Sequence, residues 1–395
     1  MSPLDWFKKQ RPLLSMQSFG GGAAGLMISG APPAIDATGG TKTTPGDGYV
    51  YHIFGLGGPG AFVVAASGKG PDGIIDLCVV GGGGGGSLNN GGGGGSGGFR
   101  ITTVDIASYG PGSYPCPLGG GGAGQPSYGN TPTRPPATPG DSSSFNIPAS
   151  ISPSPISIVA GGGGAGGPVS PTPSPPSGAE SQGTPGLPFP FPTNSPPHPN
   201  AIVFPGSGGG ARQQGPEAGD GAGAPFNSSP GTRGSGGSGG GGGGAGETSF
   251  NTDSGGATGG AGKQLPWALP TWGWGETNSA GRSGQAPSSP NPTRPAGPGG
   301  ELPWGYGWFA GGGGGGRETP GQIRGQGMAG AGDGSYANMI WGGPPQTGGD
   351  GFGGWAAPNT GSGGGGTGPS GTISPRVIGG GSGAPGVVML RYPAG

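Results

Sequence analysis

The chain has 395 residues, among them 112 glycines and 50 prolines, which together make up about two-fifths of the sequence and far exceed ordinary globular usage. Its formal net charge is −1, and its 16 lysines and arginines are spread along the chain, which argues against nucleic acid or an anionic membrane as a partner. Only 8% of the residues are charged and 29% are hydrophobic, so the backbone must be solvated or paired with little help from side chains.

The sequence carries no sign of a membrane span or of a secreted disulfide scaffold. No segment has 18 or more continuous apolar residues, and glycine and proline interrupt residues 8–30 too often for the core of a signal peptide. Cys78 and Cys116 are the only cysteines, so we expect two buried free thiols, with a bridge between them as the alternative. We therefore expect a chain that is made in the cytoplasm and has no membrane span.

The first residues predict a short helix that docks onto another protein. Ser2-Pro3-Leu4-Asp5 resembles a capping box with proline at the first helical position, which predicts a helix over residues 3–10 that ends before Pro12. Such a helix is too short to be stable alone. An apolar strip follows it, so residues 1–30 are predicted to form an anchor; the alternative is a terminus packed on its own domain. The candidate anchor residues are Leu4, Trp6, Phe7, Leu13, Leu14 and Met16.

Residues 49–118 and the last residues of the chain have the strongest strand signals. Tyr49, Tyr51 and Ile53 alternate with period two, as half-buried antiparallel strands require. A closing strand cannot stay exposed with unpaired edges, so we expect it to pair with the early strands. The predicted fold class is all-β: a small β-sandwich platform without sizeable helix content, from which glycine-rich excursions leave and return. The expected strands are 49–54, 61–65, 74–80, 99–106, 113–118 and 386–392.

Seven glycine runs raise the question of what holds their backbone in place. Ordering each residue costs about 1 to 2 kcal/mol of backbone entropy, so a run of six glycines needs on the order of 10 kcal/mol in return. Glycine has no side chain, so backbone hydrogen bonds between neighbouring segments must supply it. We therefore predict packed polyglycine II helices, which are extended and threefold; a flexible linker is the alternative. The runs are 81–86, 91–95, 119–122, 161–164, 239–244, 311–316 and 363–366.

The spacing of the glycines argues against a collagen triple helix. Collagen requires glycine at every third residue, whereas this chain has blocks of four to six glycines between irregular polar and proline-rich loops. Only short stretches such as 234–239 have larger residues at a period of three.

Five stretches of the chain, taken in order, carry a resemblance to known proteins. The first two are KKQRPLLSMQSFGGGAAGLMISG (8–30) and GDGYVYHIF (46–54). The others are IDLCVVGGGGGGSLNNGGGGGSGGFRI (75–101), SSSFN (142–146) and GSGAPGVVMLRYPAG (381–395). This order resembles the glycine-rich structural and fibre proteins of marine bacteriophages. More distantly, it resembles phage tail-fibre adhesins with sandwiches of polyglycine II helices.

The resemblance implies a virion appendage, a fibre or spike that attaches the particle to its host. It implies a homo-oligomer, with a trimer as the first expectation, on the virion surface. The N-terminal segment would bind other virion proteins of the capsid or tail, and loops on the glycine helices would bind a host-surface glycan or protein. The alternative is a purely structural capsid or tail decoration without a receptor. The chain departs from the usual pattern in its proline-rich loops at 126–140, 168–200 and 285–300.

These patterns divide the chain into four predicted parts. Residues 1–30 form the virion anchor segment, and residues 31–160 form the N-terminal β platform with the first polyglycine excursions. Residues 161–375 form a glycine- and proline-rich region of polyglycine helices and loops. Residues 376–395 supply the strand that completes the platform.

No set of residues predicts catalysis, a cofactor or a metal site. His52 alternates within a predicted strand, and His198 lies in a proline-rich loop without a cysteine or an acid at metal-ligand spacing. Glu217 and Asp220 lie in a glycine-rich loop without the apolar surroundings that would separate two carboxyl pKa values. Matches to G-x-G-x-x-G arise by chance here, and none opens a predicted helix after a strand. We therefore expect a protein that is not an enzyme.

Aromatic residues are concentrated in one part of the chain, where seven of the eight tryptophans lie between residues 267 and 355. Two segments there open with Leu-Pro-Trp and continue with further rings. We predict that the segments 264–275 and 300–310 lie together as an exposed host-contact patch, because rigid rings give large contact area at low entropic cost. The alternative is that the rings cover the glycine helices or fill a subunit interface. The candidate contact residues are Trp267, Trp272, Trp274, Trp304, Tyr306, Trp308 and Phe309.

Overall fold

A computed structural model describes residues 34–55, 60–88, 91–126, 135–167, 202–204, 242–245, 259–267, 307–316, 327, 331–332, 334, 353–368 and 379–395. Within these residues the chain is almost all β, with one four-residue helix, α1 (Ile106–Tyr109), and one 3-10 turn, η2 (Gly70–Gly73). The all-β prediction is therefore confirmed. Within the same residues, no helix has the length and apolar character that crossing a membrane requires. The predicted N-terminal helix and all six candidate anchor residues lie outside the described part of the chain.

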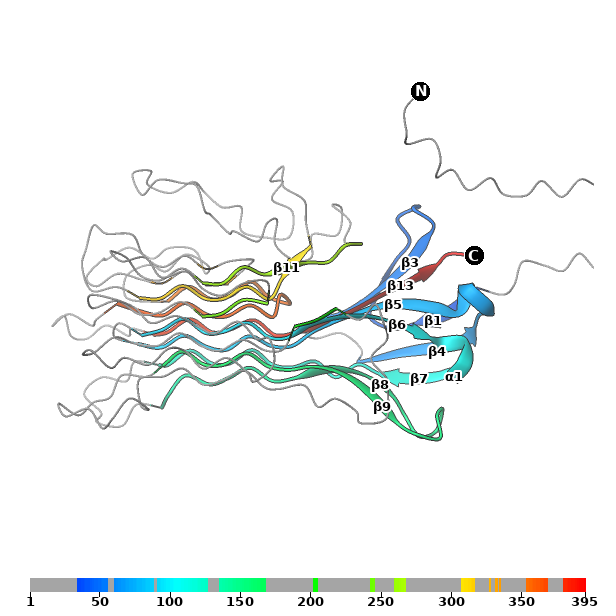
Figure 1. Ribbon diagram of the computed structural model, residues 1–395, viewed down its shortest axis with the longest axis horizontal. Coiled ribbons are helices and arrows are strands. Elements are labelled where there is room, and N and C mark those ends of the chain that lie inside the picture. The colour runs from blue at the N-terminus through cyan, green and yellow to red at the C-terminus, as the bar shows by residue number, and fades with distance from the viewer. Residues whose placement is uncertain are drawn as a thin grey trace, which may run out of the picture.

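A six-stranded antiparallel sheet forms the centre of the platform (Figure 1). Its strand order is β10-β6-β5-β13-β3-β2. The C-terminal strand β13 lies between β5 and β3, and its Leu390 is opposite Leu77 on one side and His52 on the other. The predicted pairing of the closing strand with the early strands is thus confirmed. The strands are β2 (Thr41–Thr43), β3 (Tyr49–Phe54), β5 (Ile74–Val80), β6 (Phe99–Asp105), β10 (Ile202–Phe204) and β13 (Val387–Pro393).

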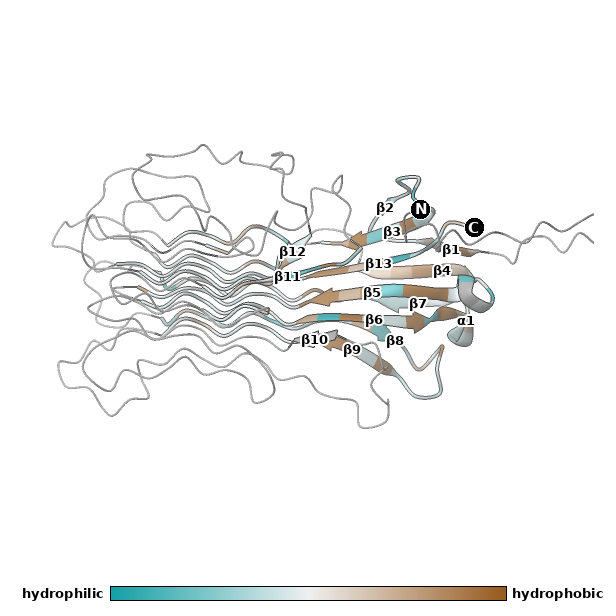
Figure 2. Cartoon of the chain, turned by 45° about the horizontal axis from the view of Figure 1, so that its top comes forward, coloured by the Kyte–Doolittle hydropathy of each residue, from teal (hydrophilic) through white to brown (hydrophobic). Residues whose placement is uncertain are grey.

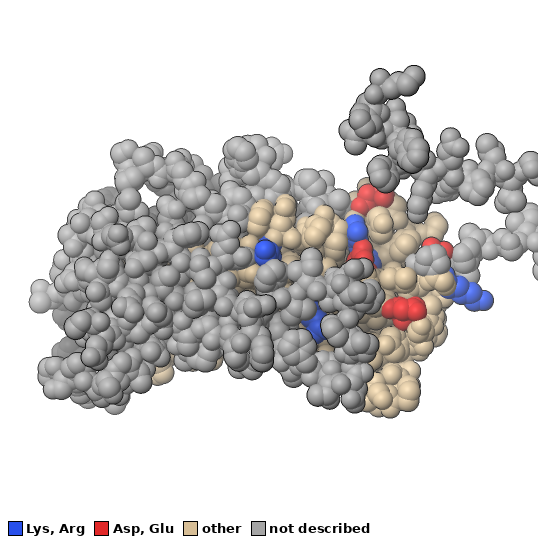
Figure 3. Space-filling model, in the orientation of Figure 1, with Lys and Arg blue, Asp and Glu red and all other residues tan. Residues whose placement is uncertain are grey.

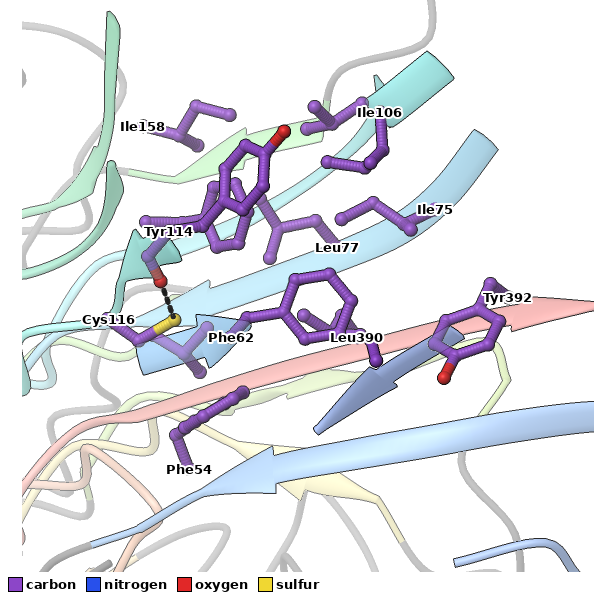
Figure 4. Close-up of a cluster of buried hydrophobic side chains, with 14 of the residues drawn as sticks. Phe54, Phe62, Ile75, Leu77, Ile106, Tyr114, Cys116, Ile158, Leu390 and Tyr392 are labelled. Atoms are coloured by element: carbon purple, nitrogen blue, oxygen red, sulfur yellow. Dashed lines mark hydrogen bonds between the residues drawn. The ribbon is translucent and has the colours of Figure 1, made fainter. Parts of the chain in front are cut away.

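A smaller sheet and a hairpin pack over one face of the central sheet and complete the β-sandwich. Phe62 of β4, Tyr114 of β7 and Phe145 of β8 are all fully buried there. The rings of Tyr114 and Phe145 stack with their centroids 5.7 Å apart, and the ring of Phe62 lies between those of Tyr114 and Tyr392, at 6.3 and 6.2 Å (Figure 4). Burying each such side chain stabilises the fold by about 1.5–3 kcal/mol. The small sheet has the order β1-β4-β7, with β1 (Ile35–Thr38), β4 (Ala61–Ser67) and β7 (Gly112–Pro115), and the hairpin pairs β8 (Ser143–Ile147) with β9 (Ile156–Ala160).

Both faces of the central sheet are buried, which corrects the prediction of half-buried strands. In β3, Val50 and Phe54 enter the first core, whereas Tyr51 and Ile53 belong to a second hydrophobic cluster on the opposite face. Much of this second cluster comes from residues that are distant from β3 in sequence. The alternation of residues within β3 cannot show that these distant residues cover its second face. These distant residues are Ala245, Leu265, Trp267, Phe309 and Ala310.

The two cysteines are separate, buried thiols. Cys78 and Cys116 are both free and buried, so the prediction is confirmed. Burial raises the pKa of Cys116 to about 12 and also raises the pKa of Cys78. Both side chains therefore act as protonated, small apolar groups of the core.

The strands of the platform continue directly into glycine-rich segments. β5 leads into residues 81–88, and residues 91–98 lead into β6. These segments lie side by side and extend away from the sheets in the same direction (Figures 1 and 2). We call the whole set the glycine bundle. Its described segments are 81–88, 91–98, 116–126, 135–142, 161–167, 242–245, 259–262, 310–316, 353–360, 361–368 and 379–386.

Candidate functional site

The backbone amides of residues 81–88 follow a strict period of three. Gly81, Gly84 and Ser87 donate to the segment 91–98 at 2.9, 2.9 and 3.0 Å. The first residue after each of Gly81 and Gly84 donates to the segment 135–142, and the second donates to the segment 379–386. This is the periodicity of an extended helix with about three residues per turn. The polyglycine II assignment itself rests on backbone angles and rise, and stays a prediction.

Carbonyl groups of residues 81–88 follow the same period toward three further segments. Gly82 and Gly85 accept from the segment 161–167 at 2.8 and 2.9 Å. The first carbonyl after each of these two accepts from the segment 116–126, and the second accepts from the segment 361–368. Residues 81–88 are therefore enclosed by six neighbours, and hydrogen bonds to all of them offset the entropy lost by the ordered glycines.

Close packing in the interior of the bundle explains why its residues are glycines. A Cβ atom added to Gly84 would lie closer than 3.0 Å to the carbonyl of Gly164, and one added to Gly313 would lie as close to the carbonyl of Gly364. Neither neighbour can move away, because each carbonyl belongs to another tightly packed backbone. A single methyl group therefore cannot be accommodated at these positions.

Outer segments tolerate side chains at two positions of every three. In the segment 135–143, Ala137, Gly140 and Ser143 are buried and the residues between them are exposed. Hydroxyl groups also take the place of backbone acceptors at this surface: Ala123 N donates to Thr138 Oγ1 at 2.8 Å. Sequence reasoning did not identify this pattern, although a small residue at every third position of PPATPGDSS (135–143) was a visible signal.

Two predicted aromatic segments meet at the junction between bundle and platform. The strand β11 (Lys263–Gln264) pairs with β12 (Trp308–Phe309), so the predicted proximity of the two segments is confirmed for their described residues. Phe309 is fully buried and stacks on Phe99 with the ring centroids 6.4 Å apart. Trp267 is also buried, with its ring centroid 6.3 Å from that of Tyr51.

These burials correct the assignment of Trp267 and Phe309 as exposed contact residues, because both belong to the second hydrophobic cluster. Trp308, next to Phe309, is half-buried. The other four candidates, Trp272, Trp274, Trp304 and Tyr306, lie outside the described residues.

A charged side chain ties Trp267 to the central sheet. Arg391 of β13 donates from Nε to Asp76 Oδ2 at 2.8 Å. Its guanidinium carbon lies 4.3 Å from the ring centroid of Tyr49 and 5.3 Å from that of Trp267. Burial disfavours the charge of Arg391, but hydrogen bonds to Asp76 and Tyr51 outweigh it and raise the arginine pKa. Such cation–π contacts contribute about 0.5–2 kcal/mol.

His52 of β3 is buried beside the first core, where its ring contacts those of Phe62 and Tyr392. Its side chain is fully buried, with Nδ1 2.7 Å from Gly39 O and Nε2 3.1 Å from Tyr392 Oη. A carbonyl can only accept, so Nδ1 carries the proton and Nε2 accepts from the tyrosine hydroxyl. Burial lowers the pKa of His52, which favours the neutral imidazole.

The described residues contain no group of three or more His, Cys, Asp or Glu side chains that could hold a metal ion. His198, Glu217 and Asp220 lie outside them. On the face shown in Figure 3, the charged side chains of the described residues lie over the strands and their junction with the bundle.

The chain matches no model of a known protein family and no curated protein.

Proposed function

We propose that this protein is a bacteriophage virion appendage, a fibre or spike whose polyglycine helices hold host-contacting loops away from an all-β platform. The observation that carries the proposal is the threefold hydrogen bonding around residues 81–88. It supports a stiff rod made of backbone alone, as the resemblance to phage glycine-rich proteins implies. In this proposal the protein is made in the host cytoplasm and resides on the virion surface as a homo-oligomer, with a trimer as the first expectation.

The direction of the chain supports recognition at the end of the bundle. Residues 88 and 91, 126 and 135, and 368 and 379 are paired segment ends that lie at the end away from the sheets (Figure 1). In this proposal the sequence between the two ends of each pair can vary without changing the bundle. These connections are the proposed carriers of contact with a host glycan or protein.

A second candidate is a structural capsid or tail decoration without a receptor. The burial of Trp267 and Phe309 favours it, because two predicted contact residues serve the core instead. Location on the particle separates the two functions. A fibre places the bundle at a projecting tip, whereas a decoration places it flat against the shell or tail.

The experiment is cryo-electron tomography of virions labelled with an antibody against residues 369–378. We expect label at the distal ends of projecting fibres, and purified protein should reduce adsorption of particles to host cells. Label in a flat lattice would favour decoration, and absence of the protein from purified particles would refute both functions.

A truncation tests the proposed anchor separately. Deleting residues 1–30 should prevent incorporation into particles, and the melting temperature of the truncated chain shows whether platform and bundle still fold without them. Normal incorporation of the truncated chain would refute the anchor.

A further inference from the structure

Trp355 is the most exposed large hydrophobic side chain among the described residues. Its exposed fraction is 56%, compared with 42% for Val63 and 40% for Ile74. It lies in the outer segment 353–360, in which the buried residues Gly354, Ala357 and Thr360 recur at every third position and Gly353 is also buried. Trp355 and Pro358 occupy exposed positions between them. The ring is therefore on the side of the bundle, separate from the aromatic junction at Trp267.

The backbone that carries Trp355 is fixed on both sides. Gly353 and Ala356 donate their N–H groups to the segment 379–386 at 2.9 and 3.0 Å. The carbonyl of Gly354 accepts a hydrogen bond of 2.9 Å from a further segment of the bundle. A ring on such a rigid support loses little backbone entropy when it binds a ligand.

Polar groups remain open to a ligand on the adjacent segment. Within the described chain, the N–H groups of Gly379 and Ser382 and the carbonyls of Gly380 and Gly383 have no hydrogen-bond partner. The hydroxyl of Ser382 accepts from a bundle amide at 3.3 Å and can still donate its own proton. An aromatic face therefore lies one segment away from both donors and acceptors.

Charge restricts the kind of ligand that fits. The segments 353–368 and 379–386 contain no Asp, Glu, Lys or Arg. A phosphate, a nucleic acid or a charged peptide would find no counter-charge within these two segments. A neutral saccharide matches it, because a pyranose ring presents a C–H face for the indole and hydroxyl groups for the open backbone.

We propose that Trp355 and the backbone of residues 379–383 form a binding site for a neutral saccharide, with the sugar ring stacked on the indole. The site rests on the proposed function, since a host-surface glycan is the ligand class that an appendage meets. A protein partner fits less well. Protein interfaces bury clusters of aromatic and aliphatic anchors, and Trp355 has no other large exposed apolar side chain in its segment.

The test uses the full chain and neutral methyl glycopyranosides of glucose, galactose and mannose. Saturation-transfer NMR with irradiation of the indole protons should transfer signal to the C–H protons of at least one sugar. Trp355→Ala should weaken that binding by about tenfold, the contribution of one stacked ring. Trp355→Phe should retain most of it. Pro358→Ala is the matched control, because it changes the same exposed surface and leaves the indole in place.

Two results would overturn the site: equal transfer in wild type and Trp355→Ala, or no transfer to any of the sugars. Sedimentation velocity covers the competing use of the ring. If Trp355→Ala abolishes self-association and the sugars show no transfer, Trp355 is a contact between copies. Failure of the site can be distinguished from failure of the proposed function. If Trp355→Ala loses sugar binding but the protein is absent from virions, the appendage is refuted and the site is retained. If the protein is a virion fibre but Trp355→Ala binds sugar as the wild type does, the site is refuted and the appendage is retained.

Discussion

The platform and the glycine bundle satisfy the same backbone groups in different ways. In the central sheet each inner strand bonds to neighbours on two sides, and side chains such as Leu77 on one face and Ile53 on the other cover the sheet. In the bundle, residues 81–88 bond to six neighbours and have no faces to cover. The sheet is thus a layer that needs a hydrophobic core, whereas the bundle is a three-dimensional array that excludes side chains. The two regions should therefore differ in the substitutions that break them.

The largest effect is expected from adding a methyl group inside the bundle. In Gly313→Ala the new Cβ would lie closer than 3.0 Å to the carbonyl of Gly364. We expect a loss of at least about 3 kcal/mol in unfolding free energy, since the neighbouring backbone cannot yield. Gly313→Val should prevent folding. Thermal denaturation followed by circular dichroism measures both.

Gly120→Ala is the matched control in an outer segment. The nearest atom to its added Cβ is Asp141 Oδ2 at 3.3 Å, at the end of a side chain that can rotate. Its melting temperature should stay close to that of the wild type. A Gly313→Ala protein that melts with the control would mean that the run is only a tether.

The second largest effect concerns the junction where the two regions meet. Trp267→Ala removes a buried ring from the cluster that covers the central sheet, so we expect a loss of about 3–5 kcal/mol in unfolding free energy.

Trp272→Ala tests the retained part of the host-contact proposal, and should keep the melting temperature while reducing adsorption of particles. If adsorption is unchanged in stable Trp272→Ala particles, that ring has no part in host contact.

The platform could be predicted well from the sequence because its strands contain strong local signals. The predicted bounds of β3 and β5 agree with the structure, and β13 differs from its prediction by one residue at each end. β1, β2 and the β8–β9 hairpin were missed. Their short runs, such as TKT in β2 and SSFNI in β8, contain too few apolar residues for a clear alternation. Both are fixed instead by pairing with the next strand along the chain, β2 with β3 and β8 with β9.

The candidate site was harder to predict for a different physical reason. Glycine runs predict close packing, but nothing in a run states which segments become its neighbours. The side chains at the edges, Thr138 and Ser382, act on amides 15 and 258 residues away in sequence. Likewise, the Leu-Pro-Trp echo predicts that two segments meet, but cannot tell whether Trp267 faces solvent or Tyr51.

A smaller, pH-dependent effect should be confined to the platform. Burial lowers the pKa of His52 in the folded protein, so the unfolded chain binds a proton more readily. The stability that this group contributes is present above its ordinary pKa of about 6.5 and is lost as the pH falls below it. The melting temperature should therefore decrease from pH 7 to pH 5. His52→Gln should be less stable at pH 7 but should show a smaller decrease; an equal decrease in both proteins would assign the effect to other groups.

The smallest effect is expected at the edge of the bundle, where a side chain does what a backbone does inside. Thr138 Oγ1 accepts from Ala123 N at 2.8 Å. In Thr138→Val the shape is kept and the acceptor is lost, but Ala123 is exposed and water can replace the hydroxyl. We expect a loss of only about 0.5–1 kcal/mol in unfolding free energy, measured by denaturant titration.

Ser143→Ala is the buried comparison, because its Oγ accepts from Gly119 N at 2.9 Å where water has no access. It should cost about 1–3 kcal/mol. If both variants lose the same unfolding free energy, water does not replace the lost acceptor at the outer segments. Hydrogen bonds at the edge of the bundle then contribute as much stability as those in its interior.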